Sequence, residues 1–213
     1  WAGLNIVSLN HSYRQETNGL VYANQVRAQA WAIRSIAEVA HALPNSHLQK
    51  NYFNSILANN LAHYATYQHS SMQSPIGAMI GSGSTHHAAP WQNDFVGTIF
   101  SLLVENNEPG AKTMLDWINK FNIGRFENET NGFCTAHAPG YFWKVRKDTG
   151  EFITSWADLY ATNYPTEQGK ACSTLSITEG YPHLALGYAA IARGTLAAAS
   201  NAGSKGAASS YQA

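Results

Sequence analysis

The chain has 213 residues, of which 45% are hydrophobic and only 12% are charged. This hydrophobic share is typical of a globular protein with a real core and argues against a disordered chain. The 13 basic and 13 acidic residues balance, which gives no electrostatic reason to bind a nucleic-acid backbone or an anionic membrane. A neutral, polar surface instead suits neutral polymers or other proteins as partners.

The apolar runs are all shorter than the roughly 20 residues that a transmembrane helix needs, so we expect no membrane span. The start, "WAGLN", is neither an initiator methionine nor a signal peptide. We therefore expect the remainder of a longer polypeptide to accompany these residues. The two cysteines, Cys134 and Cys172, fit one disulfide of a secreted protein, although two free thiols of a cytosolic protein would look the same.

The first half of the chain has helical periodicity. From Leu20 to Leu43 apolar residues recur at spacings of three and four, which predicts a helix that Pro44 ends. A second apolar face runs from Leu48 to Tyr67 and follows the short link "LPNSH". Two helices joined by so short a link predict an antiparallel hairpin.

The same pattern occurs twice more. A helix is predicted over about 90–105, followed by one that carries Met114, Leu115, Ile118 and Phe121, and Pro109 fits the first turn of the latter. A third pair consists of a helix that starts around 152–160 and an Ala-rich helix over about 179–199. The stretches "YFWKV" and "EFIT", closed by "DTG", are the one strand pair that we expect.

These elements predict an all-α protein built from three antiparallel helical hairpins. The arrangement expected is an α/α solenoid or a partial α/α toroid with long loops on one rim. Residues 1–200 would form a single domain. The tail 201–213 has lost its apolar periodicity and is predicted to be a linker.

Loops on a rigid scaffold usually carry the functional residues, and here they combine aromatic, amide and carboxylate side chains. Aromatic faces stack on sugar rings, amides and Arg bind hydroxyl groups, and two carboxylates can act as acid and base at a glycosidic bond. The candidate catalytic residues are Asp94, Glu179, Tyr141 and His137. The candidate substrate-binding residues are Trp91, Asn93, Arg125, Trp143, Tyr181 and His183.

Two cleavage mechanisms are open. Asp94 and Glu179 would serve hydrolysis, whereas Tyr141 with His137 and Arg125 would serve elimination beside a uronate. Asp94 also fits a purely structural role in the first turn of its helix, and the aromatic residues of the 141–143 loop also fit packing. Trp91 is the stronger sign of a ligand, because a helix start has no need of a large aromatic side chain.

We expect no metal and no cofactor. Adjacent histidines such as His86 and His87 rarely ligate one ion together, and the sequence contains neither H-E-x-x-H nor C-x-x-C spacing.

The stretches "RAQAWAIRSIAEVA", "YFNSILANNLAHY" and "PWQNDF" resemble helical segments of α/α-toroid domains of large secreted bacterial proteins, several of them polysaccharide-active. The resemblance implies an extracellular or cell-surface domain that binds a polysaccharide and cleaves it as a hydrolase or a lyase. Non-catalytic members share the scaffold, so it leaves the reaction open. The alternative is a non-enzymatic structural or assembly subunit of an extracellular complex.

Overall fold

The computed structural model describes residues 12–15, 20–23, 25–66, 74–81, 85–175 and 185–212. Within these ranges most residues are helical, which confirms the all-α expectation. None of the helices described is long and apolar enough to span a bilayer.

The first predicted helix begins later than its periodicity indicates. Helix α2 runs over Val26–Ala42, whereas the residues before it form strand β2 (Leu20–Ala23), antiparallel to β1 (Ser12–Gln15). The backbone N–H of Val21 also donates to Oδ1 of Asn60, at 2.8 Å. Helical periodicity alone does not reveal a strand that is defined by its pairing with another segment.

Helix α3 (Lys50–Ala65) follows, and α4 (Pro90–Glu105) has the predicted bounds. Leu48 was expected on the buried face of α3, but it precedes that helix and is 95% exposed. Helix α5 (Ala111–Asn122) is capped by Gly110, whose φ of 83° only glycine adopts freely. Pro109 therefore lies before the helix and not in its first turn.

Short elements occupy the middle of the chain. Helix α6 (Gly124–Glu127) and the 3₁₀ helices η2 (Glu129–Asn131) and η3 (Thr135–His137) come first. Strand β4 (Trp143–Lys144) pairs antiparallel with β3 (His87–Ala88).

Of the strand pair predicted from "YFWKV" and "EFIT", the structure has one antiparallel bridge. It joins Arg146, directly after the first stretch, to Phe152 in the second. The third predicted helix begins at Trp156 and not at Phe152, because Ser155 accepts a hydrogen bond from the N–H of Asp158 and caps α7 (Trp156–Asn163).

The end of the chain is helical. After the 3₁₀ helices η4 (Pro165–Glu167) and η5 (Cys172–Thr174), helix α8 spans Ala185–Asn201. The tail predicted to be a linker contains helix α9 (Ala207–Gln212), which packs against α8. Burial of the small side chains of Ala207 and Ser210 explains how this segment folds without an apolar periodicity.

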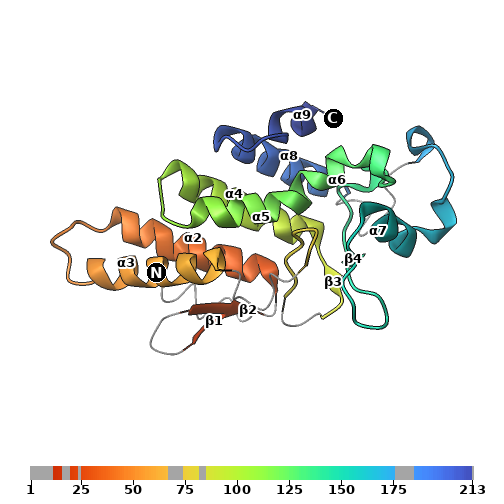
Figure 1. Cartoon of the computed structure of the whole chain (residues 1–213). Helices are drawn as coiled ribbons and strands as arrows, with labels where there is room; N and C mark the ends of the chain where they lie inside the picture. The colour runs from red at the N-terminus through yellow and green to blue at the C-terminus, as the bar shows by residue number, and fades with distance from the viewer. Residues whose placement is uncertain are drawn as a thin grey trace.

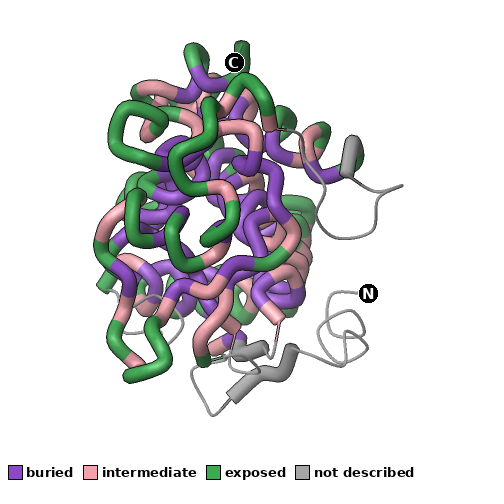
Figure 2. The backbone as a smooth tube through the Cα atoms, turned by 90° about the vertical axis from the view of Figure 1, so that its right-hand side faces the viewer, coloured by how far each residue is buried: buried purple, intermediate pink, exposed green. Residues whose placement is uncertain are grey.

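Helix α4 lies at the centre of the helical packing. It contacts α2, α5 and α8, and α2 in turn contacts α3 (Figure 1). Apolar side chains of α2 to α5 form one core, and a second core surrounds Phe121, Phe133 and Trp143 near α7. Figure 2 shows buried segments through the middle of the molecule and exposed turns around them.

Cys134 and Cys172 form a disulfide with a Cα–Cα distance of 5.3 Å. The bridge ties the start of η3 to η5 across 38 residues of sequence. Of the two states that the sequence left open for these cysteines, the structure has the bridged one.

Candidate functional site

Three aromatic rings from distant parts of the chain meet at the N-terminal end of α4. The rings of Trp91 and Tyr141 are nearly parallel, with centroids 6.3 Å apart and 9° between their planes. Tyr188 of α8 lies 5.9 Å from Trp91 and 5.6 Å from Tyr141. Phe142 adjoins Tyr141 at 6.3 Å and is 47% exposed. We call these four residues the aromatic platform.

Strand pairing explains why the platform forms. Strand β3 leads into α4 through Ala89, so Trp91 follows it closely, while Tyr141 and Phe142 directly precede β4. Because β3 and β4 pair antiparallel, the two aromatic segments are brought to the same edge. Contact of α8 with α4 then adds Tyr188.

The surroundings of the platform supply few charges. The His87 ring stacks on Phe142, with centroids 4.7 Å apart. Burial, aided by the charges of His86 and Lys144, lowers the pKa of His87, which favours the neutral form of this ring.

One cation lies beside the platform. The guanidinium of Arg27 is 5.3 Å from the centroid of the Trp91 ring, a cation–π distance. The indole Nε1 of Trp91 is buried and has no hydrogen-bond partner among the described residues. The platform thus combines packed aromatic rings, of which Phe142 is the exposed one, with the guanidinium of Arg27.

The candidate acid Asp94 lies in the interior. Its carboxylate pairs with Arg125, and the two side chains are 1% and 0% exposed. Burial raises the pKa of Asp94 to about 6, although the charge and hydrogen bond of Arg125 lower it in part. Glu179, the other carboxylate expected for hydrolysis, lies outside the described residues, as do Tyr181 and His183.

Asn93 is a buried anchor. Its Oδ1 accepts from the N–H of Met79 at 2.7 Å, and its Nδ2 donates to the carbonyls of Met79 and Ala89. These bonds attach the 74–81 segment to α4.

The three residues expected for elimination have different surroundings. Tyr141 belongs to the platform, and Arg125 pairs with Asp94. His137 is 1% exposed, and its Nε2 lies 2.6 Å from Glu167 Oε2 while its ring stacks on Tyr164. Each of these contacts fits a role in holding the loop.

Trp143 packs in the second core. It is completely buried, and its Nε1 donates to the hydroxyl of Tyr164 at 2.7 Å. A buried indole whose donor is already paired stabilises the fold and presents no face to a ligand in this conformation.

Sequence reasoning missed Tyr188 as a member of the site. The one signal available was a large aromatic residue in an otherwise Ala-rich helix. Phe142 had been interpreted as packing, together with the other aromatic residues of the 141–143 loop. Among the described residues, no group of three His, Cys, Asp or Glu side chains is placed to hold a metal ion.

Comparisons with models of protein families, with curated proteins and with solved structures found no match to this chain.

Proposed function

We propose that this protein binds a carbohydrate polymer through the aromatic platform. The observation that carries the proposal is the cluster of Trp91, Tyr141 and Tyr188 with the exposed ring of Phe142 beside it. Aromatic rings pack against the apolar faces of pyranose units, and Arg27 would donate to sugar hydroxyls. The low charge content of the chain agrees with a neutral ligand.

The disulfide supports a location outside the cytosol, because disulfides persist in oxidising compartments. We propose an extracellular or cell-surface setting on this ground. We also propose that α2 to α5 and the helices that follow form a partial α/α toroid or solenoid of hairpins. Its rim would then carry the platform.

A retention assay tests binding. The full chain would be passed over an immobilised panel of neutral glucans, mannans, xylans and uronate polymers. We expect retention on at least one polymer and at least tenfold weaker binding by Trp91→Ala, which corresponds to about 1.4 kcal/mol. Phe142→Ala should also weaken binding and, at 47% exposure, leave the fold intact.

Tyr52 offers a matched control, because it is an aromatic residue of α3 with 52% exposure and lies outside the platform. Tyr52→Ala should bind like the unmodified protein. Failure of the whole panel, or equal binding by both platform variants and the control, would refute carbohydrate binding at the platform.

Cleavage is a further step of the proposal. Hydrolysis by Asp94 and Glu179 would release reducing ends, whereas elimination by Tyr141, His137 and Arg125 would give an unsaturated product that absorbs in the ultraviolet. Binding has more support than cleavage, since Asp94, Arg125 and His137 are all buried and paired.

One observation favours the assembly subunit as a second candidate. Leu48 is 95% exposed and Tyr52 is 52% exposed. Both lie near the turn between α2 and α3, which follows the end of α2 opposite to Arg27. Exposed apolar side chains of this kind would suit contact between copies of the chain. Light scattering of the full chain at rising concentration would test this, with Leu48→Ser/Tyr52→Ser expected to remain monomeric.

A further inference from the structure

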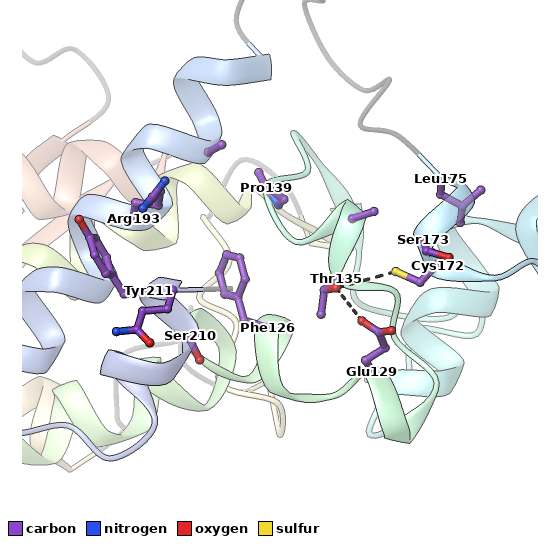
Figure 3. A pocket seen from close by; sticks show the side chains of 13 residues that line it. Phe126, Glu129, Thr135, Pro139, Cys172, Ser173, Leu175, Arg193, Ser210 and Tyr211 are labelled. Carbon is purple, nitrogen blue, oxygen red and sulfur yellow. Dashed lines mark hydrogen bonds between the residues drawn. The ribbon is translucent and has the colours of Figure 1, made fainter.

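A hollow of about 620 Å³ lies between α6, α8, α9 and the disulfide-bridged loops, and none of its lining residues belongs to the aromatic platform. Figure 3 shows Arg193 and Tyr211 on one side of it, Glu129 and Cys172 on the other, and Phe126 between them. This volume is within the range of small-molecule sites, which combine apolar walls with a few polar groups.

The hollow contains a cation that pairs with no carboxylate in the described part of the chain. Arg193 projects from α8, and its guanidinium lies 5.0 Å from the centroid of the Tyr211 ring. Within the described ranges no carboxylate pairs with it. An Arg fork in this setting is suited to bind a carboxylate through two parallel hydrogen bonds.

The opposite wall carries a carboxylate. Glu129 accepts a hydrogen bond from the hydroxyl of Thr135 at 2.7 Å, and the same hydroxyl is 3.8 Å from Cys172 Sγ. Glu129 would accept bonds from ligand hydroxyls but would repel a doubly charged anion such as phosphate.

Two further features fit a polar ring compound. Ser210 is 4% exposed, and its Oγ has no hydrogen-bond partner in the described part of the chain, although the residue lines the hollow. Phe126 offers an aromatic face, and the guanidinium of Arg125 lies 5.2 Å from its centroid. A buried unpaired hydroxyl is costly, and a ligand oxygen would satisfy it.

We propose that this hollow binds a uronate, a sugar ring that carries a single carboxylate. The carboxylate pairs with Arg193, the ring packs on Phe126 or Tyr211, and the hydroxyls bond to Glu129 and Ser210. The site shares no residue with the aromatic platform, so this inference does not depend on polymer binding there.

Calorimetric titration of the full chain tests the proposal, with glucuronate as the ligand and glucose, phosphate and benzoate as comparisons. We expect glucuronate to bind at least tenfold more tightly than any of the three. Arg193→Gln should weaken glucuronate binding at least tenfold and leave the weak binding of glucose unchanged. Arg193→Lys should retain part of the affinity, because it keeps the charge but loses the fork.

Arg34→Gln is a matched control, because Arg34 is an exposed arginine of α2 that pairs with Glu38. This variant and Trp91→Ala should bind glucuronate normally, which separates the hollow from the platform. Equal affinity for glucose and glucuronate, tighter binding of phosphate or benzoate, no detectable binding, or an unaffected Arg193→Gln variant would each overturn the proposal.

Discussion

The carboxylate of Asp94 and the guanidinium of Arg125 form an ion pair in the interior of the protein, where both side chains are almost fully shielded from water. The pair is incompletely satisfied. Asp94 Oδ2 and the Nε and Nη1 atoms of Arg125 have no partner among the described residues. The pair joins α4 to α6, and its desolvation makes both stability and pH response depend on it.

The stability of the protein should fall as the pH rises through the titration of Asp94. Burial raises the pKa of this carboxyl from 3.8 to about 6 in the folded state. Between about pH 4 and pH 6 the folded protein therefore holds a proton that the unfolded chain releases. The contribution of this proton to the free energy of unfolding is fully present below pH 4 and is lost by pH 6 to 7. A difference of about two pKa units corresponds to about 3 kcal/mol.

Urea unfolding of the unmodified protein and of Asp94→Asn at several pH values would measure this effect. The difference in unfolding free energy between the two proteins should fall by up to about 3 kcal/mol between pH 4 and pH 7. A difference that rises with pH would mean that pairing with Arg125 outweighs burial.

Replacing one partner of the Asp94–Arg125 pair should lower the free energy of unfolding more than replacing both partners together. At pH 7.5, Asp94→Ala and Arg125→Met each leave one buried group unpaired, and we expect losses of about 3 to 5 kcal/mol from either change. The double variant Asp94→Ala/Arg125→Met leaves no buried charge and should lose less unfolding free energy than either single variant. Strictly additive losses in urea unfolding would contradict this coupling.

The disulfide should contribute strongly to stability. Loss of a cross-link over 38 residues corresponds to about 4 kcal/mol in the chain-entropy model. We expect Cys134→Ser/Cys172→Ser to lose about 2 to 4 kcal/mol in unfolding free energy. Dithiothreitol should lower the unfolding free energy of the unmodified protein by a similar amount and leave that of the variant unchanged. An unmodified protein whose unfolding free energy does not change in dithiothreitol would contradict the prediction.

Two helical glycines should respond oppositely to alanine. A Cβ on Gly97 of α4 would lie 2.5 Å from Nδ2 of Asn122 and 3.0 Å from Cγ2 of Thr195. Because Asn122 Nδ2 donates to the carbonyl of Asn93, Gly97→Ala should cost about 1 to 3 kcal/mol through overpacking.

Gly194 of α8 is the matched control, since a Cβ there meets no atom of the described residues within 4 Å. Gly194→Ala should raise the unfolding free energy by about 0.5 to 1 kcal/mol, through helix propensity alone. Thermal or urea unfolding of both variants measures the contrast. If the two substitutions changed the unfolding free energy equally, α4 would have space for a methyl group at position 97, contrary to the prediction.

Helix α4 was the element best predicted, because its signals are local. Pro90 occupies the first turn, and apolar residues continue to the turn after Glu105. By contrast, β2 was taken for helix, since its apolar spacing fits both structures and only β1 and Asn60 determine which one forms. The α9 segment was missed because burial against α8, and not periodicity, makes it helical.

The sequence by itself determined the all-α class and the extent of α4, because helix periodicity and a proline in the first turn are both local features. Only the tertiary structure decided that Asp94 pairs with Arg125 in the interior, that Tyr188 joins Trp91 from almost a hundred residues away, and that the cysteines are bridged. These relationships depend on which helices pack together. Such packing is set by the burial of whole faces, which no short stretch of sequence specifies.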